Sequence, residues 1–154
     1  EIDVYVSKAA ETMLKFYRLD EELKKSFAKV TIELNSNAPF LAGMVQSHKY
    51  EFLLISPASS NTVAKIVNSI SDTLLTNAAL MSLKAYVPVW IMPVDYKEAV
   101  IYTKLPNGKD MKLRVRKEEA AQVQILEKME DVRVFENPVK MHEALSAWLK
   151  TLKQ

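Results

Sequence analysis

Two apolar runs constrain the fold of this 154-residue chain more than any other feature. Residues 52–55 read FLLI and residues 87–92 read VPVWIM, and sequence rich in helix-forming residues lies between them. Runs that are continuously apolar, rather than alternating, are typical of strands buried on both faces of a parallel sheet. Because parallel strands need long right-handed crossovers, these runs predict helices on both faces of a central sheet.

The rest of the chain alternates in the same way. Val30, Ile32 and Leu34 alternate with polar residues, which predicts a strand with one covered face. Asp20 and Asn37 are candidate helix caps. The remaining predicted strands are residues 2–6 and 132–135, and the predicted helices are residues 9–17, 20–27, 39–47, 60–86 (one helix or two in succession), 117–129 and 139 onward. This order predicts a single α/β domain over residues 1–154 with a mostly parallel sheet.

A β-hairpin is predicted over residues 100–115. Asn107-Gly108 is the strongest short hairpin signal in the chain, and apolar residues flank it on both sides. The return strand should place Met111, Leu113 and Val115 on one face. Its other face should carry Lys112, Arg114 and Arg116. Such basic residues commonly protect a sheet edge from pairing, which is one interpretation of this face.

Composition excludes several classes of function. The chain has no cysteine, so it cannot form a disulfide, a thiolate metal site or a cysteine-bound iron–sulfur cluster. A formal net charge of +2 does not indicate a nucleic-acid-binding protein. No apolar run approaches the roughly 18 residues of a membrane span, and no signal pattern opens the sequence. These features favour a cytoplasmic protein, with no metal site expected and with His48 and His142 as plain surface residues.

Small polar residues follow two of the predicted strands. Ser7 comes after the first strand, and Ser59, Ser60, Asn61 and Thr62 come after the strand at residues 52–55. Ligands of open parallel sheets bind at the carboxyl ends of the strands. The hydroxyls, the amide and the start of a helix could together bind ribityl, carbonyl or anionic oxygens. An alternative is that Ser59 or Ser60 only caps the following helix.

The same turn carries a recognisable motif. PASSNT at residues 57–62, followed by AKIVNSISDTLLTNA, resembles the PASANT motif of the homo-oligomeric flavin-containing cysteine decarboxylase superfamily. VYVSKAAETMLKFY, ELNSNAPFLAG, VPVWIMP and RVRKEEAAQVQILEKMEDVRVFENP resemble one branch, the archaeal flavoproteins related to dihydromethanopterin reductase. This similarity extends over nearly the whole chain. It implies a three-layer α/β/α Rossmann-like (flavodoxin-like) fold, with FMN at a subunit interface of a homotrimer or an assembly of trimers.

The resemblance also implies a function. It is that of an FMN-dependent oxidoreductase, an electron-transfer flavoprotein that accepts electrons from a ferredoxin-type iron–sulfur protein and reduces an acceptor such as dihydromethanopterin. The positions that match the family's flavin contacts are Ser7, Ala58, Ser59, Ser60, Asn61 and Thr62. Candidate substrate or donor contacts are Asn35, Asn37, Arg114 and Arg116, with turn and cap duty as the alternative for the two asparagines. A different class of function is a chemically inactive assembly or regulatory subunit.

Three departures from the superfamily pattern bear on the reaction. Gly43 lies near the position where the decarboxylases carry an acid–base histidine, and the sequence Met92-Pro93-Val94-Asp95-Tyr96 lacks the asparagine of their PxMN motif. We therefore expect no decarboxylase activity. The family also begins with one further strand and a phosphate-binding loop, and the 154 residues contain no counterpart of either.

Overall fold

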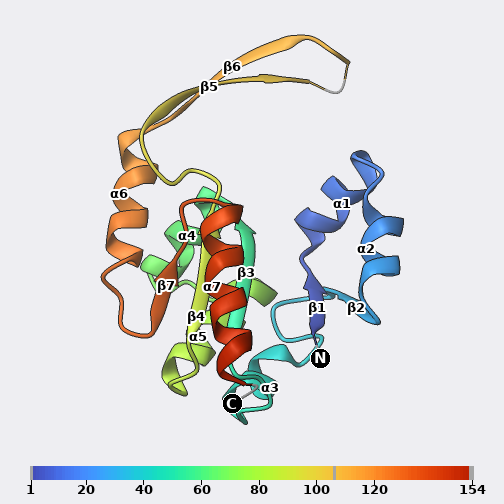
Figure 1. Cartoon of the computed structure of the whole chain (residues 1–154), viewed down its shortest axis with the longest axis vertical. Coiled ribbons are helices and arrows are strands. Elements are labelled where there is room, and N and C mark those ends of the chain that lie inside the picture. Colours follow the sequence, from blue (N-terminus) through green and yellow to red (C-terminus); the bar gives the residue numbers. More distant parts are fainter. Residues whose placement is uncertain (1, 106, 153–154) are drawn as a thin grey trace.

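The structure is a computed structural model that describes residues 2–105 and 107–152 (Figure 1). The strands in this part of the chain are β1 (Asp3–Val6), β2 (Lys29–Ile32), β3 (Leu53–Ala58), β4 (Val89–Pro93), β5 (Ala99–Lys104), β6 (Asp110–Val115) and β7 (Val132–Val134). The helices are α1 (Lys8–Phe16), α2 (Asp20–Ser26), α3 (Leu41–Gln46), α4 (Ser60–Val67), α5 (Leu74–Lys84), α6 (Lys117–Leu126) and α7 (Pro138–Thr151). None of the helices described is long and apolar enough to cross a membrane.

The parallel strands form two separate groups. β1 pairs with β2, and β3, β4 and β7 pair in that order. Figure 1 shows β1 beside β3, with both strands running toward the same edge of the molecule. Among the described strands, β5 and β6 pair only with each other, as an antiparallel hairpin that stands away from the body of the domain. The predicted α/β class with a mostly parallel sheet is confirmed.

Helices cover both faces of the β3-β4-β7 sheet, which gives the expected three layers. On one face, Val63 and Ile66 of α4 and Leu126 of α6 pack on Ile55 and Ile91 of the strands. All of these side chains are at most 3% exposed, so this is the main core of the domain. Burial of this apolar surface is the dominant stabilising term of the fold.

The opposite face is aromatic. Phe52 stacks on Trp90 with ring centroids 4.4 Å apart, and Trp148 of α7 meets Phe52 edge-on at 4.9 Å. Trp90 is 7% exposed, as expected for a residue of the buried apolar run at residues 87–92. A third cluster, formed by α3, α5 and Tyr5 of β1, connects the β1–β2 pair to the rest of the domain.

The end of β2 differs from the sequence-based prediction. The alternation at residues 30–34 placed Leu34 with the covered side chains and Glu33 with the open ones. In the structure β2 ends at Ile32, Glu33 is 8% exposed and Leu34 is 67% exposed. The reason is that Glu33 accepts hydrogen bonds from two backbone N–H groups, which stabilise its carboxylate inside the protein.

Two of the predicted helix caps are wrong, and the structure also shows whether residues 60–86 form one helix or two. The N-cap of α2 is Leu19 rather than Asp20, and α3 begins at Leu41 with Phe40 as its N-cap, so Asn37 does not cap it. Residues 60–86 form two helices, since Asn68 ends α4 and Thr73 caps α5.

The hairpin itself is confirmed. Gly108 has a φ of 82°, a conformation that glycine adopts without strain, and its N–H donates to the Leu105 carbonyl at 2.8 Å. Arg116, however, is not part of the return strand. β6 ends at Val115, and Arg116 is the N-cap of α6, paired with Glu119.

Candidate functional site

Ser7 and Ser59 each begin a helix at the carboxyl end of a strand. The Ser7 Oγ accepts a hydrogen bond from the Ala10 N–H at 3.1 Å, and the Ser59 Oγ accepts one from the Thr62 N–H at 3.3 Å. Ser59 therefore caps α4 and Ser7 caps α1, and their contacts with a flavin stay a prediction. A capping hydroxyl uses only an oxygen lone pair, so its hydrogen can still be donated to a ligand or to a neighbouring group. In Ser59 the neighbouring group is the Thr62 hydroxyl, 3.2 Å away.

Ser60 joins this turn to the next strand. Its hydroxyl donates to the carboxylate of Asp95, which follows β4. The backbone supports the same junction, because the Val94 N–H donates to the carbonyl of Ala58 at 3.0 Å. Ala58 is fully buried, so a larger side chain there would disturb the join between β3 and β4. The role of Asp95 was not predicted, and its position directly after a buried strand was the available signal.

Asn61 differs from its neighbours. Its side chain is exposed, and it has no hydrogen-bond partner among the residues that the structure describes. It lies in the first turn of α4, an eight-residue helix with no acidic residue in that turn. The N-terminus of α4 therefore offers the Asn61 amide together with unpaired backbone N–H groups and the positive end of the helix dipole. This arrangement suits a ligand that presents oxygen acceptors or an anionic group.

Glu33 links two helix N-termini at the edge where β1 and β2 end. Its Oε2 accepts from the Lys8 N–H at 3.0 Å, and its Oε1 accepts from the Leu74 N–H at 2.7 Å. These N–H groups belong to the first residues of α1 and α5. Since Lys8 directly follows Ser7, this carboxylate fixes the position of the Ser7 turn relative to α5. No local pattern in the sequence indicated this role of Glu33.

The turn that contains Asn35 and Asn37 is held by α5, the helix whose first residue, Leu74, bonds to Glu33. The Asn77 Nδ2 of α5 donates to the Ser36 carbonyl at 2.9 Å and to the Asn37 Oδ1 at 3.0 Å. The Asn35 Oδ1 accepts from the Asn37 N–H at 2.9 Å. These bonds show that Asn35 and Asn37 hold the turn, which is the alternative given above. Their contact with a substrate stays a prediction.

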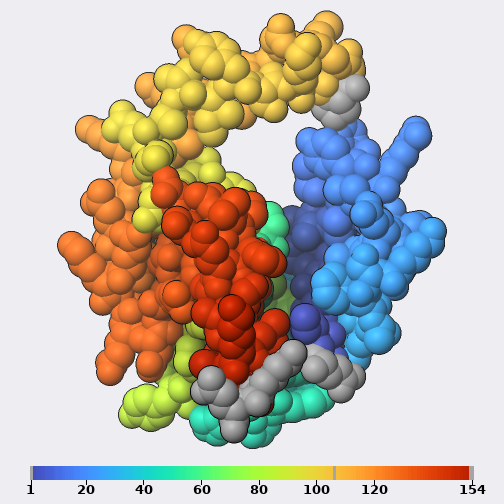
Figure 2. All heavy atoms as spheres, in the orientation of Figure 1, coloured from blue at the N-terminus to red at the C-terminus, as the bar shows by residue number. Residues whose placement is uncertain are grey.

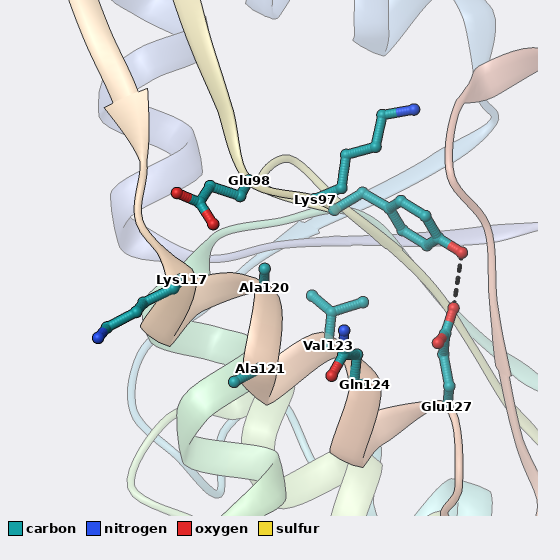
Figure 3. A pocket seen from close by; sticks show the side chains of 9 residues that line it. Lys97, Glu98, Lys117, Ala120, Ala121, Val123, Gln124 and Glu127 are labelled. Carbon is teal, nitrogen blue, oxygen red and sulfur yellow. Dashed lines mark hydrogen bonds between the residues drawn. The ribbon is translucent and has the colours of Figure 1, made fainter.

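A shallow pocket of about 470 Å³ lies between the β4–β5 connection and α6 (Figure 3). Ala120 and Ala121 leave room along the helix, and Lys97 and Glu98 line the opposite side. At one end the Tyr96 hydroxyl donates to the Glu127 Oε1 at 2.6 Å. This bond to a carboxylate, together with partial burial, raises the pKa of Tyr96 to about 12. This pocket was not predicted from the sequence.

Gly43 lies near the position at which the decarboxylases of the superfamily carry a histidine. A Cβ added at Gly43 would overlap the ring of Phe40, so a side chain there requires Phe40 to move. His48 and His142 are both exposed, as expected. Among the described residues, no group of three histidine, aspartate or glutamate side chains is placed to hold a metal ion.

The two predicted arginine contacts lie in different surroundings. Arg114 is exposed on β6, opposite Val100 of β5. Arg116 instead forms an ion pair and hydrogen bonds with Glu119 at the start of α6, which lowers the pKa of the Glu119 carboxyl. Neither arginine contacts the turns that contain Ser7 and Ser59 in the part of the chain that the structure describes.

Comparison with known proteins identifies the class of this fold and site. The model of the flavoprotein family matches residues 1–146, and the chain belongs to that family. It is 38% identical over 154 residues to an uncharacterized protein of Methanocaldococcus jannaschii, a match that covers 100% of this chain and 83% of that protein. It is 39% identical over 119 residues to the dihydromethanopterin reductase (acceptor) of the same organism, covering 73% of this chain and 48% of the reductase. The chain thus spans about half the length of that reductase.

A solved structure agrees with the sequence relatives. Burkholderia xenovorans DmrB in complex with FMN, described as a cubic protein cage for redox transfer, superposes with a TM-score of 0.83. That match is 33% identical and covers 99% of this chain and 83% of DmrB. A dodecameric FMN-dependent UbiX-like decarboxylase of Escherichia coli shares the fold at 15% identity, with a TM-score of 0.60 over 87% of this chain and 64% of that protein.

These findings confirm the predicted family, fold and flavin cofactor, since the family is that of flavoproteins and DmrB carries FMN. The residues at the strand ends fit such a group. They offer hydroxyl and amide donors and the N-terminus of α4, and the two carboxylates described at this edge already have partners: Asp95 accepts from Ser60, and Glu33 accepts from the N–H groups of Lys8 and Leu74. The assignment of individual contact residues remains a prediction.

Proposed function

We propose that this protein is an FMN-dependent oxidoreductase whose flavin lies against the turns that follow β1 and β3. The observation that carries the proposal is the free Asn61 amide at the N-terminus of α4, in a chain that matches FMN-bound DmrB over 99% of its length. In this proposal Ser7, Ser59, Ser60 and Thr62 contribute hydroxyls beside it. Bound FMN would supply the hydride or electron chemistry, and the protein would position the ring and exclude competing reactions.

The proposed acceptor is a pterin of the dihydromethanopterin class. Two relatives named dihydromethanopterin reductase (acceptor), from Methanocaldococcus jannaschii and Methanosarcina mazei, are 39% and 36% identical to this chain, which supports that class. Each aligns over 48% of its own length, so the part aligned with this chain is about half of a reductase. We propose a small iron–sulfur protein of the ferredoxin type as the electron donor, since the chain has no cysteine with which to bind a cluster of its own.

Decarboxylation of a peptidyl or phosphopantothenoyl cysteine is not part of this proposal. General acid–base catalysis needs a group within hydrogen-bond reach of the transferred proton. Gly43 offers no such group, and the Phe40 ring fills the space beside it. A release of carbon dioxide from either substrate at enzyme-like turnover would contradict this part of the proposal.

We also propose that the protein works as a homo-oligomer, a trimer or an assembly of trimers. DmrB, at 33% identity, is described as a cubic protein cage, which supports a self-assembling subunit. The dodecameric UbiX-like decarboxylase shares the fold alone and adds no support.

The test uses the purified full-length chain. We expect flavin absorbance in the purified protein or after addition of FMN, bleaching of that absorbance by reduced ferredoxin, and its recovery when dihydromethanopterin is added as acceptor. Recovery without the pterin, in an anaerobic control, would contradict the proposed acceptor. A protein that binds no FMN would contradict the oxidoreductase and favour the inactive assembly subunit.

A further inference from the structure

The hairpin β5–β6 has two chemically different faces. Residues paired directly across an antiparallel ladder lie on the same face. The pairs Ala99–Val115, Ile101–Leu113 and Thr103–Met111 therefore form one face, which we call the neutral face because none of its members is charged. The pairs Val100–Arg114, Tyr102–Lys112 and Lys104–Asp110 form the other, the basic face.

The neutral face is not covered within one chain. Ile101 is 38% exposed and Leu113 is 47% exposed, although both are large apolar residues in the middle of the hairpin. Only Val115, at the base of the hairpin, is buried. Figure 2 shows the hairpin as an arch, with open space between its span and the rest of the molecule.

An uncovered hairpin of this kind is poorly stabilised by itself. A two-stranded ribbon in water is only marginally stable, and it needs a packed apolar face to hold its shape. Contiguous exposed apolar side chains on a soluble protein mark an interaction site. We propose that the neutral face of β5–β6 is a contact surface between copies of this chain, an inference that rests on the homo-oligomer in the proposed function.

Exposure alone does not choose between the faces, since Val100 and Tyr102 of the basic face are 56% and 74% exposed, but the distribution of charge favours the neutral face for contact with a second copy. A surface that meets another copy of the same chain must not oppose its own charge, and the neutral face meets that condition. The basic face does not, because Lys104, Lys112 and Arg114 outnumber Asp110 and like charges brought together would repel. The cage formed by DmrB, which is 33% identical over 99% of this chain, supports association between copies of such a subunit.

The first experiment compares two double variants of the full-length chain by sedimentation equilibrium. Ile101→Lys with Leu113→Lys places charges on the neutral face, and Val100→Lys with Tyr102→Lys places the same number on the basic face of the same hairpin. We expect the first variant to raise the apparent dissociation constant of the assembly by about tenfold or more, as loss of a central apolar contact does. The second should assemble like the parent.

A second experiment does not depend on whether the first variant folds. Because the 154 residues include no cysteine, Ile101→Cys and Tyr102→Cys each introduce a unique thiol into this chain. In the assembled protein we expect a maleimide to label the thiol at position 101 much more slowly than that at position 102. Dilution below the dissociation constant should speed labelling at position 101 and leave labelling at position 102 unchanged.

The outcomes separate the inference from the proposed function. An assembly that the neutral-face variant leaves intact, or equal labelling of both thiols, would overturn the inference and leave the oligomer standing. Dissociation by the basic-face variant alone would assign the contact to the other face and overturn it too. A parent chain that is monomeric at all concentrations would overturn both the inference and the proposed oligomer, whereas FMN binding is measured separately by flavin absorbance.

Discussion

Asn61 is the residue on which the proposed flavin site most depends. Replacement by leucine removes the amide and leaves polar atoms of the flavin without a partner, so we expect FMN binding to weaken by about 1–3 kcal/mol. The free energy of unfolding of the apoprotein should change by no more than about 0.5 kcal/mol, because the Asn61 side chain has no protein partner among the described residues. Fluorescence titration with FMN and urea denaturation measure the two quantities. Undiminished FMN affinity would remove Asn61 from the site.

Replacement of Glu33, unlike that of Asn61, is expected to lower the free energy of unfolding of the apoprotein. Glu33→Ala leaves the N–H groups of Lys8 and Leu74 without their acceptor, at an expected cost of about 1–3 kcal/mol for each one that water does not reach. Urea denaturation of the apoprotein measures the loss. Glu33→Gln retains one acceptor oxygen and should fall between the alanine variant and the parent. Glu51→Ala, at an exposed carboxylate, serves as the matched control with a change within about 0.5 kcal/mol. Equal stabilities of the alanine variants at positions 33 and 51 would refute this role of Glu33.

At the scale of the elements, the sequence predicts well what depends on local pattern. Strands β3 and β4 follow from continuous apolar runs, and the hairpin follows from Asn107-Gly108, because each signal lies within the element itself. The role of Glu33 could not be predicted in this way. Its partners Lys8 and Leu74 lie 25 and 41 residues away in the sequence, and the apolar alternation around it suggested the opposite face. The same holds for Asp95, whose partner Ser60 is 35 residues away.

The hydrogen bond between Tyr96, which follows β4, and Glu127, at the end of α6, should make the stability of the fold depend on pH. The Tyr96 hydroxyl donates to Glu127, and this bond raises its pKa to about 12 from an ordinary value of 10.0. Because the folded pKa is the higher one, the stabilisation from this bond is fully present below pH 10 and is lost as the pH rises toward about 12. Glu127→Gln should bring the pKa of Tyr96 down toward its ordinary value.

Alkaline titration of the phenolate absorbance measures this pKa. The signal of Tyr96 is the difference between each protein and its Tyr96→Phe counterpart, which removes the contribution of the five other tyrosines. Glu118→Gln, in the same helix, is a control that should leave the titration unchanged. If Tyr96 titrates at the same pH with and without the Glu127 carboxylate, burial rather than the hydrogen bond is the cause of its raised pKa.

At the scale of the whole molecule, the hairpin serves two proposed contacts without conflict. Its neutral face is proposed to meet another copy of the chain, which leaves the basic face available to a different partner. The sequence predicted basic residues on one face, and the structure retains Lys112 and Arg114 there. Arg116 no longer belongs with them, because it is paired with Glu119 at the start of α6. An electron-donor site on the hairpin would therefore depend on Lys112 and Arg114.

Lys112→Glu with Arg114→Glu tests whether the basic face receives an acidic electron donor. Electrostatic docking mainly raises the association rate and weakens with salt, since the Debye length is about 8–10 Å at moderate ionic strength. We therefore expect ferredoxin to reduce bound FMN several-fold more slowly in this variant at low salt, and the difference to disappear at high salt. Reduction by dithionite, which needs no docking, should be unchanged. Lys25→Glu with Lys128→Glu makes the same change in net charge at exposed positions outside the hairpin and should match the parent. A reversed-charge hairpin that accepts ferredoxin electrons at the parent rate throughout the salt series would show that Lys112 and Arg114 only keep the edge of the hairpin from pairing.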